Sequence, residues 1–185
     1  MSDLLERLDK LRDVIQDPDF LAGRGLNNNV NIRIFCYDPH EEMAVRYFLE
    51  NLTTDQSLKC HIREYNLYKL FLSICDDRRI TDRIAGQEAQ KGTEFVLNQL
   101  KRIAVNNTFA EKMKYEPHQR GDLVLITGVG EAYPFIRVHA LLEALQSYFN
   151  DVPILVMYPG SCDGHELRLF NLLKPNAYYR AFSEI

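Results

Sequence analysis

The chain of 185 residues contains no long apolar run and only four cysteines, and both scarcities exclude classes of protein. No stretch approaches the roughly 20 apolar residues that a membrane-spanning helix needs. Residues 1–18 alternate charged residues with leucine, so we expect no signal peptide there. The cysteines are scattered and form no CxxC pair or zinc-like spacing. Three of them have apolar neighbours, and we expect these three to act as small apolar side chains in a cytoplasmic protein.

Basic residues are also in short supply, since 22 Lys and Arg face 26 Asp and Glu for a formal net charge of -4. An acidic chain has no electrostatic reason to bind phosphate backbones without regard to sequence, so direct nucleic-acid binding is not expected. Hydrophobic residues make up 46% of the chain and charged residues 26%, as in an ordinary globular protein. Length and composition predict one domain over residues 1–185.

Strands and helices are predicted to alternate along the chain. Two nearly unbroken apolar runs, 121–126 and 153–158, are typical of strands in the middle of a sheet covered on both faces. Further strands are predicted at 30–36, 58–64 and 178–182, the last at an edge. Helical patterns between them favour a three-layer α/β sandwich with a mainly parallel, roughly five-stranded sheet. The predicted fold is P-loop-like or Rossmann-like, without a Walker motif.

Apolar spacing and capping residues predict the helices of the first two thirds of the chain. Residues 2–17 form one amphipathic helix in this interpretation. Asp38 and Glu41 form a capping box at the start of the next helix, and Asn66 caps the one after it. A helical insertion over about 76–116 separates the second strand from the third. Its charged faces are either solvated surface or a docking arm for a partner.

Two further helices are predicted in the last third of the chain. Pro134 occupies the first turn of a helix that ends near Phe149. Asp163 and Glu166 form another capping box, which opens a helix that ends at Lys174.

The loops after the predicted strands carry residues suited to binding. In an open parallel sheet these loops share the edge at the carboxyl ends of the strands, where helix N-termini also expose N–H groups. We name this edge the strand-end rim and expect the ligand or partner site there. Its candidate residues are Thr127, Gly128, Gly130, Tyr133, Arg137, His139, Tyr158, Gly160 and Asp163.

Two glycines in the segment ITGVGEAYP, Gly128 and Gly130, would let the backbone approach a ligand closely. The segment lacks the lysine and hydroxyl of a P-loop and does not match GxGxxG, so P-loop ATP hydrolysis is not expected. A tight strand-to-helix turn and a site for a nucleotide or another anion both remain open. Arg137 bears on this choice, because a cation near a helix N-terminus opposes the helix dipole. It favours a nearby carboxylate or a ligand anion, unless it snorkels on the surface.

A catalytic or metal centre is not predicted. Asp38 and His40 at one helix start recur as Asp163 and His165 at another, but both aspartates serve as caps. No metal or other cofactor is therefore expected. No Ser, Cys or Thr occupies a nucleophile elbow, and Cys162 on the rim has no assigned base.

The segment YYRAF near the C-terminus is a second candidate surface. Its aromatic residues surround an arginine, a combination that suits protein recognition at the edge of a sheet. Ordinary packing of an edge strand is the alternative. The candidate partner-binding residues are Tyr178, Tyr179, Arg180 and Phe182.

Several of these segments resemble the BrxB family, a small component of the BREX (bacteriophage exclusion) systems. The similarity spans the chain and is most specific in TGVGEAYPFIRVHALLEALQ, in the YPG…DG turn and in the closing YYRAF. The FCYDPHEE junction and the helix start at Asn66 agree with it. Cys162 and Asn171 depart from the pattern, where an aromatic residue and a glycine are expected.

The resemblance implies a cytoplasmic bacterial or archaeal protein that acts in antiphage defence within a multi-protein complex. Its implied direct partner is a PglZ-type protein of the alkaline phosphatase superfamily, alongside other BREX components. It implies no catalysis and no cofactor of the chain's own. A non-catalytic adaptor is therefore the leading hypothesis. A nucleotide- or anion-binding regulator that uses residues 127–130 and Arg137 is the alternative, and a homodimer is compatible with either.

Overall fold

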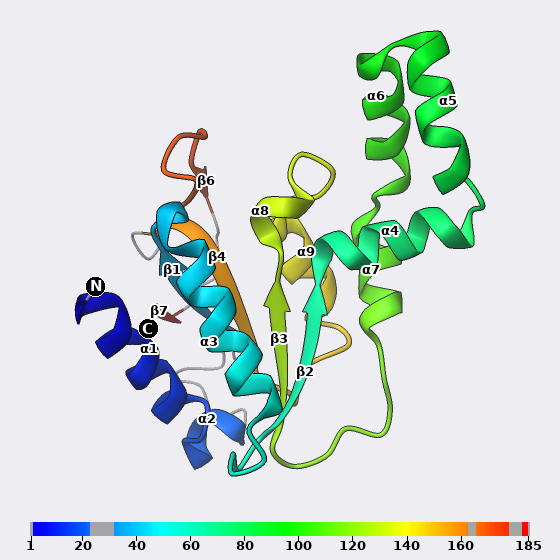
Figure 1. Ribbon diagram of the computed structural model, residues 1–185. Coiled ribbons are helices and arrows are strands. Elements are labelled where there is room, and N and C mark those ends of the chain that lie inside the picture. The colour runs from blue at the N-terminus through cyan, green and yellow to red at the C-terminus, as the bar shows by residue number, and fades with distance from the viewer. Residues whose placement is uncertain (1, 23–31, 163–165, 178–182, 185) are drawn as a thin grey trace.

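A computed structural model describes residues 2–22, 32–162, 166–177 and 183–184. Helices lie on both faces of one mainly parallel sheet, so the predicted three-layer α/β sandwich is confirmed (Figure 1). The strands are β1 (Ile32–Tyr37), β2 (His61–Asn66), β3 (Asp122–Thr127), β4 (Ile154–Cys162), β5 (Glu166–Leu169), β6 (Asn176–Ala177) and β7 (Ser183–Glu184). The helices are α1 (Ser2–Val14), α2 (Pro18–Leu21), the 3-10 turn η1 (Pro39–Glu41), α3 (Glu42–Thr54), α4 (Leu67–Asp77), α5 (Thr81–Lys91), α6 (Thr93–Ile103), α7 (Asn106–Met113), α8 (Val129–Ala132) and α9 (Val138–Leu145).

Five parallel strands form the main sheet, in the order β2-β3-β4-β1-β7. Every residue of β3 is buried, which is why this central strand is a continuous apolar run in the sequence. The strand predicted at 178–182 lies outside the described residues, and the short β7 directly after it pairs with β1 at the edge. Because the strands are parallel, Tyr37, Asn66 and Thr127 end β1, β2 and β3 at the same side of the sheet.

The two faces of the sheet carry two apolar clusters, because successive strand residues point to opposite faces. On one face, Phe35 and Leu125 pack with the apolar stripes of α1 and α3. On the other face, Ile34 and Ile126 pack with buried residues of α4, α7 and α9. Figure 1 shows α1, α2 and α3 on one side of the sheet and α4, α7 and α9 on the other.

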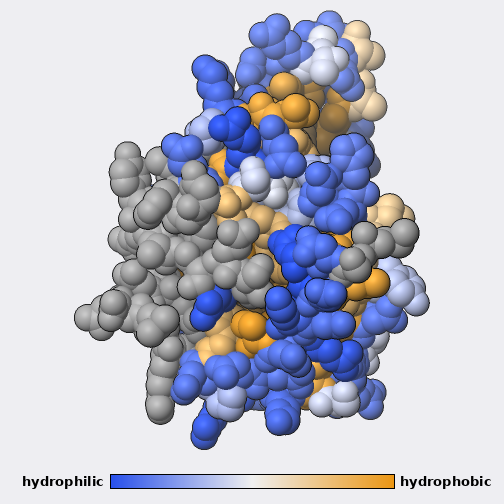
Figure 2. Space-filling model, turned by 90° about the vertical axis from the view of Figure 1, so that its left-hand side faces the viewer, coloured by the Kyte–Doolittle hydropathy of each residue, from blue (hydrophilic) through white to orange (hydrophobic). Residues whose placement is uncertain are grey.

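The helices α5 and α6 form a hairpin that projects beyond the strand-end side of the sheet (Figure 1). We name residues 80–103 the arm, which forms the top of the molecule in Figure 2. No residue of α5 is buried, and α6 buries Val96 and Leu100. The predicted helical insertion is confirmed. Only the arm projects from the body, however, because Phe109 and the other buried residues of α7 belong to the core under the sheet.

The structure contradicts the helix predicted over 163–174, because β5 occupies the middle of that segment. Leu167 and Leu169 are buried while Glu166 and Arg168 are exposed, which is the period of two that characterises a strand. β5 pairs antiparallel with the end of β4. The capping-box spacing that predicted the helix is therefore a coincidence of sequence, since Glu166 begins a strand.

The N-terminal helix is shorter than the predicted range 2–17. α1 ends at Val14, and Pro18 begins the separate helix α2 instead of merely following the end of α1. The side chain of Asp17 accepts hydrogen bonds from two backbone N–H groups of α2, at 3.0 and 2.9 Å. This N-cap stabilises the second helix and explains the break.

The helix predicted from Pro134 to near Phe149 is also interrupted. The segment forms α9 only from Val138 onward, and Pro134 lies in the connection between α8 and α9. Phe135 is not part of a helical stripe. Its ring stacks on Phe71, with the two centroids 4.2 Å apart. Aromatic packing against α4 therefore accounts for an apolar residue that the sequence assigned to helical periodicity.

Two predicted helix starts are confirmed. The carboxylate of Asp38 accepts a hydrogen bond from the N–H of His40 at 2.9 Å, and Glu41 accepts one from the N–H of Asp38 at 3.3 Å, which completes the capping box. Asn66 caps α4 by accepting a hydrogen bond from the N–H of Lys69 at 3.0 Å. Local side-chain chemistry thus sets both turns at the carboxyl ends of β1 and β2.

Candidate functional site

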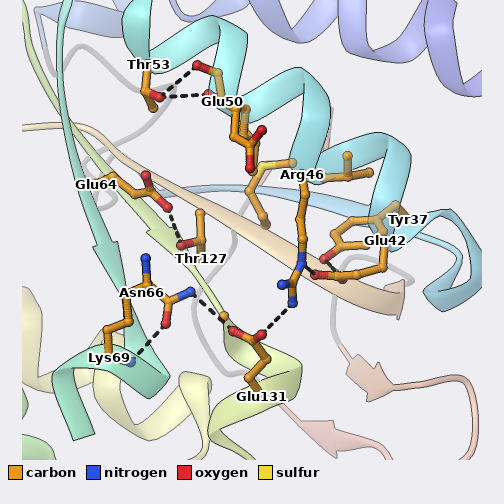
Figure 3. A pocket seen from close by; sticks show the side chains of 14 residues that line it. Tyr37, Glu42, Arg46, Glu50, Thr53, Glu64, Asn66, Lys69, Thr127 and Glu131 are labelled. Carbon is orange, nitrogen blue, oxygen red and sulfur yellow. Dashed lines mark hydrogen bonds and ion pairs between the residues drawn. The ribbon is translucent and has the colours of Figure 1, made fainter. Parts of the chain in front are cut away.

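A cavity of about 210 Å³ opens at the strand-end rim, between α3 and the ends of β2 and β3 (Figure 3). We name it the rim cavity. Its lining comes from elements far apart in the sequence, as the parallel sheet predicts. The labelled lining residues in Figure 3 are Tyr37, Glu42, Arg46, Glu50, Thr53, Glu64, Asn66, Lys69, Thr127 and Glu131.

The end of β3 is tied to the end of β2 inside this cavity. Thr127 is buried, and its Oγ1 donates a hydrogen bond to Oε1 of Glu64 at 2.7 Å. A buried hydroxyl needs such a partner, because an unsatisfied polar group in a core is costly. The predicted site residue Thr127 therefore joins two neighbouring strands.

Glu131 is the centre of a polar network that we name the rim network. Its Oε1 accepts from the Arg46 guanidinium at 2.5 Å, and its Oε2 accepts from the side-chain amide of Asn66 at 3.3 Å (Figure 3). Arg46 also donates to Oε1 of Glu42 at 2.7 Å, and the hydroxyl of Tyr37 donates to Oε2 of Glu42 at 2.6 Å. Side chains from β1, α3, the β2–α4 junction and α8 are thus connected across the rim.

The network sets the charge states of its members. Burial by itself raises the pKa of Glu131, but hydrogen bonds from Arg46 and Asn66 outweigh it and leave that pKa below its ordinary value. Burial and the hydrogen bond to Glu42 raise the pKa of Tyr37, so its hydroxyl stays protonated and acts as a donor. Hydrogen bonds to Glu42 and Glu131 raise the pKa of Arg46. The charged groups are therefore held in the states that the hydrogen bonds require.

The rim cavity as a whole is acidic. Glu42, Glu50, Glu64 and Glu131 contribute four carboxylates, against the cations Arg46 and Lys69. This balance opposes a phosphate or another anion, since like charges repel most strongly where solvent is partly excluded.

A second cavity of about 260 Å³ lies beside the glycine turn, and both Gly128 and Gly130 line it. A Cβ at Gly128 would lie 2.6 Å from the side chain of Asn66, and one at Gly130 would lie 2.8 Å from the ring of Phe170. The absence of a Cβ at either position thus allows the protein to pack closely on itself. The tight-turn interpretation has this geometry in its favour, and the anion-binding alternative stays a prediction.

The structure separates the predicted site residues into two groups. Tyr133, Arg137, His139 and Tyr158 line a small cavity of about 20 Å³ with Val129, Leu169 and other apolar residues, whereas Gly128 and Gly130 line the cavity beside the turn. The Arg137 guanidinium lies 5.8 Å from the centroid of the Tyr133 ring. The structure does not bring Arg137 and the glycines to one cavity.

The small cavity is largely apolar, and its titratable groups respond to that burial. Desolvation, reinforced by the positive charge of Arg137, lowers the pKa of His139 below its ordinary value. Burial raises the pKa of Tyr158. Arg137 itself is the residue directly before α9, so it does lie at a helix N-terminus as expected, although Pro134 is not in that helix.

Gly160 is a described site residue that does not line the rim cavity. Gly160 lies in β4 where β5 pairs with it, and a Cβ there would lie 2.2 Å from the backbone oxygen of Arg168. Gly160 therefore permits close approach of a strand. Asp163 and the strip formed by Tyr178, Tyr179, Arg180 and Phe182 lie outside the described residues.

Two of the side chains that hold the rim together, Arg46 and Glu131, were not among the residues predicted from the sequence. Arg46 was not a candidate, although Glu42 and Arg46 are spaced i, i+4 on one helix face, which favours an ion pair. Glu131 directly follows Gly130, but it was not predicted to be a site residue. Its partners come from α3 and β2, and local spacing does not reveal them.

Within the described residues, no group of three or more His, Cys, Asp or Glu is arranged to hold a metal ion. Cys36, Cys60 and Cys75 are buried, as expected of small apolar side chains, and Cys162 is half-buried. Among the helices in these parts of the chain, none has both the length and the apolar character needed to cross a membrane.

Comparisons with known proteins agree on one family. The family model described as "BREX protein BrxB" matches residues 63–183. A BREX protein BrxB of Bacillus cereus (strain H3081.97) is 38% identical over 187 residues, covering 97% of this chain and 96% of its own. A BREX protein BrxB of Escherichia coli O9:H4 (strain HS) is 31% identical over 186 residues, covering 95% and 88%. No solved structure matches significantly. With a family model over more than half its length and two relatives over nearly all of it, this chain belongs to the BrxB family of BREX proteins.

Proposed function

We propose that this BREX phage-defence component is a non-catalytic adaptor that acts in the cytoplasm and binds a PglZ-type protein of the alkaline phosphatase superfamily. In this role the chain would position a larger partner through its strand-end rim or its C-terminal strip. Family membership supports the place in a BREX system. The adaptor role and the identity of the partner are the proposal.

The observation that carries the proposal is an exposed apolar pair on α3. Met43 and Tyr47 are 75% and 70% exposed, and their i, i+4 spacing places them on one face of the helix. The opposite face of α3 buries Val45 and Leu49 against the sheet. Large apolar and aromatic side chains that are not needed in the core are typical of protein-recognition surfaces.

The rim network beside this pair supports a binding role over a catalytic one. Glu131 accepts hydrogen bonds from both Arg46 and Asn66, which joins α3, the N-cap of α4 and α8. A rim whose polar groups hold secondary-structure elements in place is a rigid platform, and rigid platforms lose little entropy on binding a partner.

Affinity purification of the tagged full chain from cells that carry its BREX system tests the proposal. We expect the PglZ-type protein to be recovered with the wild type and to be lost with Met43→Ser/Tyr47→Ser if the rim docks. Loss with Tyr179→Ala/Arg180→Ala would assign the contact to the C-terminal strip instead. Leu5→Ser is the matched control, because Leu5 is a 58% exposed apolar residue on α1.

Two results would contradict the adaptor. One is purification of the wild type without any BREX component. The other is an intrinsic hydrolase activity of the purified chain that disappears on Arg137→Ala.

A further inference from the structure

The arm carries an apolar groove of about 350 Å³ between its two helices. On α5 the groove is lined by the stripe Ile80, Ile84, Gln87 and Lys91, which repeats at steps of three and four residues. Figure 2 shows apolar side chains gathered over the arm, with hydrophilic side chains around them. The arm therefore presents an amphipathic surface that continues outward from the core cluster on its side of the sheet.

The α6 side of the groove has a buried and an exposed half. Val96 and Leu100 are 6% and 9% exposed and belong to the core cluster, whereas Phe95 is 39% exposed. The Lys91 ammonium lies 4.8 Å from the centroid of the Phe95 ring, at the tip of the arm. A large aromatic side chain thus remains partly exposed to solvent at the edge of an apolar groove.

The helix α5 is poorly stabilised by the chain itself. None of its residues is fully buried, Ile84 is only partly buried against the core cluster, and its N-cap position, Ile80, makes no side-chain capping hydrogen bond. Gly86 lies in the middle of the helix, where glycine costs about 1 kcal/mol relative to alanine, and no neighbouring atom requires it there. Helices of this length are marginal without tertiary packing. A partner seated in the groove would supply packing that α5 lacks.

The charges around the groove favour an acidic partner. Lys91 is the one charged residue in its lining, and every residue of the arm is described. Helical spacing also places Arg83 on the face of Ile80, and Arg102 on the face of Phe95. Of the three acidic residues of the arm, Asp82 and Glu94 fall on the opposite faces of their helices, and only Glu88 flanks the groove. The groove edges are therefore basic in a chain of net charge -4.

We propose that the arm groove binds an amphipathic helix with acidic flanks from another protein of the assembly. A groove between two helices accepts a third helix through its apolar face, with anchors at i, i+3 or i+4 and i+7. The arm helices have 11 residues each, about 16 Å in length, so the complementary segment spans roughly three turns. Its carboxylates would meet Lys91, Arg83 and Arg102.

A second copy of this chain fits the groove less well. Isologous pairing of two arms sets identical surfaces against each other. Basic edges would then face basic edges, and like charges brought together across an interface disfavour association.

This inference rests on the proposed adaptor function, so its test includes a position that reports on the adaptor independently. The photo-crosslinking residue p-benzoylphenylalanine replaces Phe95 in the full chain, and Tyr47 on the rim in a parallel variant, in cells that carry the BREX system. Mass spectrometry then identifies the crosslinked peptide. We expect position 95 to crosslink to a helical segment of another BREX protein with an apolar face and acidic flanks.

A charge-reversal pair sharpens the result. Lys91→Glu and Lys101→Glu make the same change in the last turns of α5 and α6, but Lys101 lies on the side of α6 that faces away from the groove. Lys91→Glu is expected to lower the crosslink yield about tenfold, and Lys101→Glu less than about twofold.

The other outcomes overturn the inference. A crosslink from position 95 to a second copy, or to a segment without acidic flanks, contradicts the stated partner chemistry. Equal effects of the two charge reversals contradict the basic edge. If position 95 gives no product while position 47 does, the arm fails and the adaptor stands. If neither position gives a product and no BREX component copurifies, both proposals fail.

Discussion

The sheet and the arm are both rich in apolar residues, but they use them in different ways. Every residue of β3 is buried, and its neighbours on both faces belong to the same chain. In the arm, no residue of α5 is fully buried and Phe95 stays 39% exposed. The chain's own helices thus cover the apolar surface of the central strand β3. The arm presents apolar surface in excess of what its own folding uses, which is the property expected of a docking element.

The largest expected difference between the two regions comes from replacing a phenylalanine by alanine in each of them. Phe109 in α7 has 0% of its surface exposed, and Phe95 in α6 has 39%. Phe109→Ala is expected to lower the free energy of unfolding by about 3–5 kcal/mol, because it leaves a cavity in the core. Phe95→Ala should cost about 1 kcal/mol or less. Urea unfolding of both variants measures the difference.

Equal losses for the two phenylalanines would break the comparison. They would mean that the arm is packed as tightly as the sheet, and the docking inference would lose its physical basis.

Replacing one glycine by alanine in each region should change the stability of the protein in opposite directions. Gly128 has φ +68°, and a Cβ there would meet Asn66 at 2.6 Å, so Gly128→Ala should destabilise by about 1–3 kcal/mol. A Cβ at Gly86 in α5 would meet no atom within 4 Å, so Gly86→Ala should stabilise by about 0.5–1 kcal/mol. Thermal unfolding gives both signs. Destabilisation by Gly86→Ala would show that the arm has a packing constraint at that position.

The smallest expected difference in stability is between removing an arginine from the rim network and removing one from the arm. Arg46 and Glu131 are 45% and 36% exposed, so Arg46→Met should cost only about 0.5–1 kcal/mol. Arg83→Met, on the exposed arm, should change stability by less than about 0.5 kcal/mol. Denaturant unfolding at pH 7 compares the two variants.

The cost of Arg46→Met should also depend on pH. The folded-state pKa of Glu131 lies below the ordinary value of 4.5, so its contribution is present above that value. It is lost as pH falls through the folded pKa and the carboxylate becomes protonated. The stability difference between wild type and Arg46→Met should therefore shrink below about pH 4.5. A difference that stays constant into acid would show that Glu131 is not the relevant partner.

The sequence predicted much of the fold because the relevant signals are local. The apolar runs at 121–126 and 153–158 identified two central strands, since a strand covered on both faces needs no polar alternation. Asp38 and Asn66 identified helix starts, since a cap bonds N–H groups two or three residues away. The same local rule failed at Glu166. There a capping spacing coexisted with strand alternation, and pairing with β4 decided the outcome.

The candidate site was less predictable, because its contacts depend on which loops the sheet brings together. Arg46 and Glu131 are 85 residues apart, and their ion pair exists only because the parallel sheet brings the start of α3, after β1, and α8, after β3, to the same rim. Likewise, Arg137 and Gly128 are close in sequence, yet α8 and the following connection direct them to different cavities.

By itself, then, the sequence determined the α/β class, the two central strands, the helix caps at Asp38 and Asn66 and the presence of a helical insertion. These follow from periodicity and capping, which act over a few residues. Only the tertiary structure decided that the rim is closed by an ion-pair network and that the insertion projects with an open apolar groove. Both features depend on contacts between distant segments, and their energies come from burial and pairing that no local pattern records.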